Sequence, residues 1–282
     1  MRVDAEDHGR GALDLLASRW THSARELWAE RLAAGELSLA EAPLTADRPL
    51  RRGEVLRWRR PPWEEPQVPL HFELLHEDDD VVAVAKPSGL PTMPAGGFLD
   101  HTLLALVAAR WPDAAPMHRL GRGTSGVVLF GRRPAARAAI QAAWRARAVE
   151  KVYRALVTGH PDDAVIQAAI GPVEHPTLGT LNAASPAGRD AVSRLTVIRR
   201  EADRSVVEVR IDTGRPHQIR IHAAFLGHPL VGDPLYGPGG VPRADALPGD
   251  LGYTLHAWRL TLAHPATGAP LTLTAPLPER LR

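Results

Sequence analysis

The pattern of apolar and polar positions along the chain predicts an α+β protein. Four segments are alternating or continuously apolar over the length of a strand: residues 81–85, 127–132, 151–159 and 205–211. Helical spacing predicts helices over residues 101–111 and 134–149, and a short helix after a glycine turn within residues 213–227. Residues 255–276 have the pattern of a hairpin closed by a Gly/Pro turn. Because strands and helices follow no regular order, an α+β domain is expected instead of a βαβ repeat.

The N-terminal residues 1–60 are predicted to form a separate small α/β module. Ser23 and Glu26 have the spacing of a capping box. An apolar stripe at helical spacing accompanies it, made by Ala24, Leu27, Trp28 and Leu32. After a polar turn, residues 53–60 alternate like a strand.

A proline-rich segment, residues 61–69, follows this module. Proline cannot lie inside a helix or a central strand, so the segment is expected to be a linker. The sequence therefore predicts a module at residues 1–60, a linker at 61–69 and a larger domain at 70–282.

The small module concentrates arginine and tryptophan near its C-terminal end. The residues are Arg48, Arg51, Arg52, Arg57, Arg59 and Arg60, with Trp58 and Trp63 among them. A basic surface with interleaved aromatic rings is typical of nucleic-acid binding, since the charges contact phosphates and the rings stack on bases. The alternative interpretation is a solvated arginine face without a ligand.

Composition narrows the class of protein. The chain has no cysteine, which excludes disulfides, thiolate metal sites and a thiol nucleophile. No segment has the length of a transmembrane span, and the charged N-terminus has no secretory signal pattern, so a cytoplasmic protein is expected. The net charge is only +2, but Lys86 and Lys151 are the only lysines, so arginine supplies nearly all the positive charge. Arginine suits phosphate and base contacts, although GC-rich coding bias would also explain it.

The segment HRLGRGTSG, His118 to Gly126, is dense in groups that bind phosphate. Its glycines allow close approach of a ligand to backbone amides, and Thr124 and Ser125 add hydroxyl groups. It lacks the ending of a Walker loop and the spacing of a nucleophile elbow. The segment contains no carboxylate, and by local chemistry alone a strand-entry turn is an equally good interpretation.

A second cluster, TGRPHQIRIHAAFLGHPLVGDPLYG, spans residues 213–237. His217 and His222 are five residues apart, a spacing that does not align two metal ligands on one helix face, so no metal site is expected. Arg220 is expected to need a carboxylate or phosphate partner if it is buried, because an unpaired interior charge is costly.

Four ordered blocks of the sequence resemble the signature blocks of the RluA family of RNA pseudouridine synthases. They are HRLGRGTSG, KVYRALVTG, TGRPHQIRIHAAFLGHPLVGDPLYG and LHAWRLTLAHP. The resemblance covers roughly residue 70 to the end, and the N-terminal module is more weakly similar to a small ribosomal-protein-like RNA-binding domain. It implies a mixed, mostly antiparallel sheet with a central cleft. It also implies isomerisation of uridine to pseudouridine in structured RNA, ribosomal or transfer, by a monomer with no metal or organic cofactor.

The resemblance also implies roles for individual residues. Arg119 would fill the space left by a flipped nucleotide, Tyr153 would stack on the uracil, and Arg220 would orient the catalytic carboxylate. The remaining candidate RNA-binding residues are His118, Arg122, Thr124, Ser125, Arg215, His217 and Gln218, with Arg57 and Arg59 of the small module.

Gly121 departs from the family pattern, because it stands where the family has its catalytic aspartate. Three interpretations are open. The protein is an active synthase whose carboxylate comes from elsewhere, an inactive relative that binds RNA, or an enzyme with a different reaction on the same fold. Candidate replacement carboxylates in or beside the blocks are Glu150, Asp190, Asp212 and Asp233, although Asp233 belongs to the family pattern and is expected to be structural.

Overall fold

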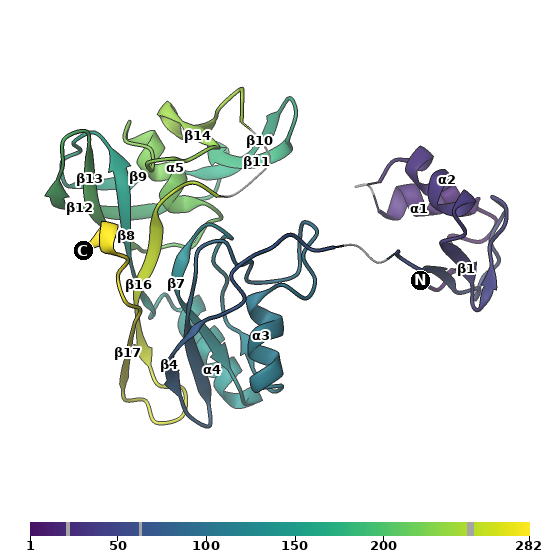
Figure 1. The fold of residues 1–282 in the computed structure, drawn as a ribbon, viewed down its shortest axis with the longest axis horizontal. Helices are drawn as coiled ribbons and strands as arrows, with labels where there is room; N and C mark the ends of the chain where they lie inside the picture. The colour runs from purple at the N-terminus through teal and green to yellow at the C-terminus, as the bar shows by residue number, and fades with distance from the viewer. Residues whose placement is uncertain (21–22, 62–63, 247–250) are drawn as a thin grey trace. The chain divides into compact units, whose positions relative to one another are not determined.

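The structure is a computed structural model that describes residues 1–20, 23–61, 64–246 and 251–282. The chain forms two compact units, Met1–Glu64 and Glu65–Arg282 (Figure 1). The division lies within the proline-rich segment at residues 61–69, and Trp63 lies outside the described residues.

The N-terminal unit packs two helices and a small sheet around one core. Its helices are α1 (Ala12–Arg19) and α2 (Arg25–Ala33), and its antiparallel strands, in the order β2-β1-β3, are β1 (Leu37–Leu39), β2 (Ala42–Pro43) and β3 (Leu56–Trp58). The core is formed mainly by leucines of α1, the α2 residue Trp28, and Leu37. The helix predicted from the apolar stripe at residues 24–32 is α2, and the strand predicted within residues 53–60 is β3. Both predictions are confirmed, whereas α1 was not predicted.

The predicted capping box is wrong. The N-cap of α2 is Ala24, and no side chain caps this helix. The Ser23 hydroxyl instead accepts a hydrogen bond from Arg31 Nη1 at 3.1 Å. Arg31 lies over the rings of Trp28 and Trp58, which fixes its guanidinium beside Ser23. Leu27, predicted on the apolar face, is 39% exposed.

The larger unit is built on one sheet of ten strands in which all neighbours but one pair are antiparallel. Along its main path the order is β4-β5-β7-β16-β8-β13-β12-β9, while β17 pairs with β16 and β6 with β7. The strands are β4 (Glu73–Glu77), β5 (Val81–Lys86), β6 (Ala115–Pro116), β7 (Ser125–Gly131), β8 (Glu150–Thr158), β9 (Ala164–Gln167), β12 (Val192–Arg200), β13 (Arg204–Ile211), β16 (Leu255–Ala263) and β17 (Pro270–Thr274). The predicted α+β class with a mixed, mostly antiparallel sheet is confirmed.

Helices cover both faces of this sheet. The core around α3 (Leu103–Arg110) contains alternate residues of β5 and β7, and the core around α4 (Pro134–Arg145) contains the residues between them. The short helix α5 (Gln218–Phe225) packs on β8, β12 and β13 through Ile219 and Ala223. None of the described helices is long and apolar enough to cross a bilayer.

Two small hairpins lie against α5 (Figure 1). One pairs β10 (Ile170–His175) with β11 (Gly179–Ala184), and the other pairs β14 (Tyr236–Gly237) with β15 (Val241–Pro242). Short 3-10 turns occur at Pro238–Gly240 and Glu279–Leu281.

Helix α4 ends four residues before the predicted position, at Arg145 instead of residue 149. Arg147 adopts a left-handed conformation with φ of 57°, and the N–H of Ala148 bonds to the carbonyl of Ala143. This geometry terminates a helix and is usually adopted by glycine.

The exception to the antiparallel pairing is the contact of β7 with β16, which is parallel. It places Gly126 beside Ala257, and Ala257 lies opposite Tyr153 of β8, so these three residues form one row across three strands. Gly126 has a φ of 113°, and a Cβ atom on it would lie 2.2 Å from the carbonyl oxygen of Ala257. Only glycine permits this approach, which brings the segment at residues 118–124 next to Tyr153.

We expect Gly126→Ala to lower the free energy of unfolding by more than about 2 kcal/mol, because the added methyl group meets backbone atoms at a strained φ. Urea denaturation measures this loss. Gly268→Ala is the control, since Gly268 also has a positive φ of 72° but open space around it, and about 1 kcal/mol is expected there. Equal losses in the two variants would contradict a close-approach constraint at Gly126.

Candidate functional site

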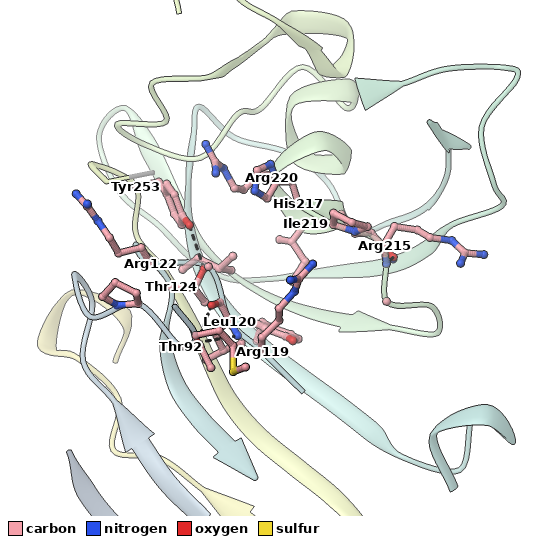
Figure 2. Close-up of a pocket in the computed structure, with 18 of the residues that line it drawn as sticks. Thr92, Arg119, Leu120, Arg122, Thr124, Arg215, His217, Ile219, Arg220 and Tyr253 are labelled. Carbon is pink, nitrogen blue, oxygen red and sulfur yellow. Dashed lines mark hydrogen bonds between the residues drawn. The ribbon is translucent and has the colours of Figure 1, made fainter. Parts of the chain in front are cut away.

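A cavity of about 820 Å³ opens beside the row formed by Gly126, Ala257 and Tyr153. Its walls come from segments that are far apart in the sequence: the loop at residues 91–98, the motif loop at 119–124, the turn into α5 at 211–220 and the residues before β16. Figure 2 shows the motif loop on one side and the start of α5 on the other. Two of the predicted signature blocks thus face each other across this cavity.

The motif loop is held by the loop that follows β5. The buried ammonium of Lys86 donates to the carbonyls of Leu90, at 2.7 Å, and Arg122, at 3.2 Å. Ser88 Oγ donates to the Gly123 carbonyl, and Thr92 Oγ1 donates to the carbonyl of Leu120. These bonds satisfy backbone carbonyls that would otherwise face the protein interior, and they fix the path of the motif.

Tyr153 lies in the wall of the cavity and packs between two core clusters. It shares a strand face with Ala155 and Val157, as the alternation predicts. Burial raises the pKa of the Tyr153 phenol to about 12. The hydroxyl group is therefore protonated at neutral pH, and the ring offers a rigid surface for stacking.

Arg220 forms a buried ion pair with Asp233. Its Nε and Nη2 atoms each lie 2.7 Å from a carboxylate oxygen of Asp233, which also accepts the N–H groups of Leu235 and Tyr236. The Arg220 guanidinium lies 4.2 Å from the centre of the Tyr253 ring. The expectation that a buried Arg220 needs a carboxylate partner is met by Asp233, which the resemblance predicted to be structural.

None of the described residues that line the cavity is an aspartate or a glutamate. Asp233 is directed at Arg220, Asp212 pairs with Arg194, and Glu150 pairs with Arg210. These three carboxylates and that of Asp190 lie outside the described lining. The Arg220–Asp233 pair forms without any contribution from residue 121, so the retention of Arg220 has a structural reason.

A family model described as RNA pseudouridylate synthase matches residues 80–225. The chain belongs to this family. The RluA-type resemblance and the RNA pseudouridine synthase class, an isomerase, are thereby confirmed.

Relatives and solved structures agree with this assignment. An uncharacterized RNA pseudouridine synthase of Synechocystis is 42% identical over 275 residues, which cover 95% of this chain and 94% of the relative. The ribosomal large subunit pseudouridine synthase D of Neisseria meningitidis serogroup A is 32% identical over 95% of this chain and 76% of its own. The structure of human RNA pseudouridylate synthase domain containing 1 has a TM-score of 0.60 at 26% identity, covering 78% of this chain and 89% of that one.

Most of the site residues predicted for this pseudouridine synthase line the cavity. They are Arg119, Gly121, Arg122, Thr124, Tyr153, Arg215, His217, Gln218 and Arg220. Arg119 is exposed at the surface, whereas Arg220 is buried. Arg119, Arg122 and Arg215 bring positive charge to the cavity, whereas the charge of Arg220 is balanced by Asp233.

His118 and Ser125 are predicted RNA-binding residues that are not among the described lining residues. His118 Nε2 accepts the N–H of Leu129, and its ring stacks on Trp144 at 5.3 Å. Burial lowers the pKa of His118 to about 4, so the ring is neutral. Ser125 Oγ lies 2.8 Å from His256 Nδ1. Both side chains connect secondary-structure elements inside the domain.

Gln218 shapes the turn before α5, although it was predicted to bind RNA. Its Oε1 accepts from Thr213 Oγ1 and from the N–H of Arg215, while its Nε2 donates to the Val192 carbonyl and to Ser193 Oγ. Both ends of the amide are thus used within the protein. The bonds hold the backbone that carries Arg215 into the cavity wall.

His217 and His222 belong to separate hydrogen-bond networks. His217, with a φ of 56°, places Nδ1 2.8 Å from the hydroxyl group of Tyr236, which donates to the Asn182 carbonyl. His222 is buried between Ser193 Oγ and the carbonyl of Ala168. The two rings do not converge on a shared site.

Sequence reasoning missed the wall contributed by Tyr253. Its hydroxyl group lies 3.1 Å from Thr124 Oγ1, which connects this wall to the motif loop (Figure 2). Phe98, under the guanidinium of Arg122 at 5.3 Å, was also missed. Both aromatic residues lie in irregular segments. Tyr253 stands two residues before the block that begins at Leu255, whereas no sequence pattern indicates Phe98.

In the N-terminal unit, Arg57 and Arg59 are exposed. Arg57 pairs with Glu41, and Arg48 pairs with Glu54. These acidic partners neutralise part of the predicted basic patch. For Arg59, the described residues include no side-chain partner.

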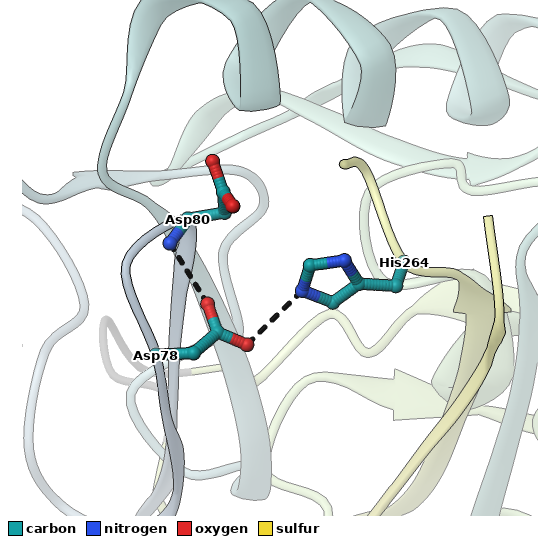
Figure 3. A group of neighbouring side chains, drawn as sticks. All are labelled: Asp78, Asp80 and His264. Carbon is teal, nitrogen blue, oxygen red and sulfur yellow. Dashed lines mark hydrogen bonds and ion pairs between the residues drawn. The ribbon is translucent and has the colours of Figure 1, made fainter. Parts of the chain in front are cut away.

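Asp78, Asp80 and His264 form a separate group of possible metal ligands outside the cavity (Figure 3). His264 Nδ1 accepts the N–H groups of Ala266 and Thr267, so Nε2 carries the proton and donates to Asp78 Oδ2 at 3.0 Å. A metal at Nε2 would have to displace that proton. We interpret the group as a hydrogen-bonded link between the turn at residues 78–80 and the turn at residues 264–267.

Asp78 is well suited to this structural role. Burial raises its pKa, but hydrogen bonds from His76, Val81, Asp80 and His264 outweigh burial and hold the pKa well below its usual range. The carboxylate therefore stays ionised at neutral pH. Its contribution to stability is fully present above the pKa of the unfolded state, about 4, and is lost progressively as the pH falls below it.

We expect Asp233→Asn to cost about 3–5 kcal/mol in unfolding free energy, because the buried Arg220 charge loses its ionised partner. Thermal and urea unfolding check this. Asp245→Asn is the matched control, since the Asp245–Arg243 pair is exposed and screened by solvent, so only a small loss is expected. A loss at Asp233 as small as that at Asp245 would refute the importance of the buried pair.

Proposed function

We propose that this chain isomerises uridine to pseudouridine in structured RNA, with the flipped uracil held against Tyr153. The observation that carries the proposal is the meeting of Arg119, Tyr153 and Arg220, from three separate signature blocks, in one cavity. The proposed roles follow from this arrangement. Arg119 is exposed beside the cavity, where it can replace the flipped nucleotide in the RNA stack. Tyr153 supplies the stacking surface.

We propose ribosomal RNA as the first substrate to test, because several relatives are named ribosomal large subunit pseudouridine synthase D. Arg122 and Arg215 would bind phosphates on either side of the flipped nucleotide. We also propose a cytoplasmic monomer that needs no metal or organic cofactor, and a boundary between RNA-binding module and catalytic domain within residues 61–69.

The chemistry requires a carboxylate from outside the motif position. We propose that an aspartate or glutamate other than Asp233 enters the cavity when RNA is bound, since Asp233 is committed to Arg220. A second function, RNA binding without isomerisation, is favoured by one observation. The described lining of the cavity contains no carboxylate.

Pseudouridine formation on unmodified ribosomal and transfer RNA transcripts distinguishes these two functions. We expect the natural protein to form pseudouridine, measured by chromatography of the digested nucleosides, with Gly121→Asp run beside it. If only Gly121→Asp forms product, the natural protein is an RNA binder. If neither protein forms product, the transcripts lack the target or the cavity performs another reaction, and total RNA is tested next.

If the natural protein is active, each Asp and Glu of residues 65–282 is replaced in turn by its amide. Loss of the reacting carboxylate should lower the rate by about a thousandfold or more. The variant that lacks the reacting carboxylate should bind RNA with unchanged affinity. Substitution of a structural residue such as Asp233 should instead change both the stability of the protein and its affinity for RNA.

Tyr153 gives a separate test of the binding geometry. We expect Tyr153→Phe to keep RNA affinity, because the ring remains, and Tyr153→Ala to weaken binding by about 1–3 kcal/mol, the value of one base–aromatic stack. Filter binding at fixed salt measures both. Equal affinities for the alanine and phenylalanine variants would contradict stacking at this residue.

A further inference from the structure

Arg147 occupies a backbone position that costs free energy for any side chain. It follows the last turn of α4 with a φ of 57°, and its N–H bonds to the carbonyl of Trp144. Glycine is the usual residue at such a helix end, and a non-glycine residue there is destabilising. Strained positions of this kind concentrate at functional sites. The exposed Arg147 side chain makes no hydrogen bond or ion pair with the described residues.

The end of α4 is attached to the motif loop. The ring of Trp144, three residues before Arg147, stacks on His118 at 5.3 Å with an interplanar angle of 26°. His118 directly precedes Arg119, which lines the cavity. Arg147 is therefore carried by an element that packs against the beginning of the motif.

Lys151 lies between Arg147 and Tyr153 along the chain. It is on β8 two residues before Tyr153, so the two side chains share a strand face. Lys151 is partly buried and has no hydrogen bond or ion pair within the described residues. Burial lowers the pKa of Lys151, the charge of Asp212 raises it, and the charge of Arg147 lowers it. Asp212 is itself paired with Arg194 at 3.2 Å.

We propose that Arg147 and Lys151 form a second phosphate-binding edge of the cavity, which takes the RNA backbone on the Arg119 side of the flipped nucleotide. This inference rests on the proposed function, since it needs an RNA strand in the cavity. The two positive charges repel each other, and a phosphate group that binds both side chains offsets this repulsion. The edge gives a reason for an arginine at a position that glycine would fill with less strain.

The test uses Arg147→Gly in the full chain, because this variant separates binding from stability. Glycine relieves the backbone strain, so the thermal unfolding midpoint should stay the same or rise. Loss of one phosphate contact should lower the slope of log affinity against log salt by about one. The probe is an unmodified transcript of large-subunit ribosomal RNA. Lys151→Met removes the second charge, and the same decrease in slope is expected.

Arg204→Ala is the matched control. It also removes one positive charge, but Arg204 begins β13, whereas Ile211 at the other end of that strand lines the cavity. This variant should therefore leave the slope unchanged. An unchanged slope for Arg147→Gly, or an equal decrease for Arg204→Ala, would overturn the inference while the natural protein still binds RNA. If the natural protein does not bind either RNA class, the proposed function fails and this inference fails with it.

Discussion

The parallel contact between β7 and β16 is the constraint on which the cavity depends. Two strands from distant parts of the chain meet at Gly126 and Ala257, where no side chain other than hydrogen fits at residue 126. This contact fixes the start of β7, and with it the preceding motif loop, at a set distance from Tyr153. The glycine at the end of the HRLGRGTSG block is therefore required by strand packing, and its presence there says little about phosphate binding.

Around this contact, some side chains leave their charged groups at the surface of the cavity, and others hold its walls. Lys86, Gln218 and the Arg220–Asp233 pair use their polar atoms inside the protein. Arg119 and Arg215 remain at the surface of the cavity. A signature block thus contains both residues that hold the fold and residues that are exposed in the cavity, and the hydrogen bonds distinguish the two kinds.

The sequence predicted the elements that are buried and continuous, and failed where an element is short or exposed. Strands β5, β7, β8 and β13 were predicted because their apolar runs are long. The edge strand β4, with its two glutamates, was missed because exposed edges carry polar residues that weaken the alternation. Strand β12 lies between β13 and β9, and it was missed because its arginines and its buried serine interrupt the apolar pattern. The early end of α4 was missed because no sequence pattern indicates that Arg147 adopts a positive φ.

The same reasoning applies to the site. The signature blocks predicted which segments meet, because family motifs record long-range contacts that local patterns lack. They did not predict that His118 and Ser125 face away from the cavity lining, since this depends on strand orientation. The ion pair of Arg220 with Asp233 also has a consequence for residue 121. Because Asp233 neutralises the guanidinium and is itself held by the N–H groups of Leu235 and Tyr236, the buried pair makes no demand on the side chain at residue 121.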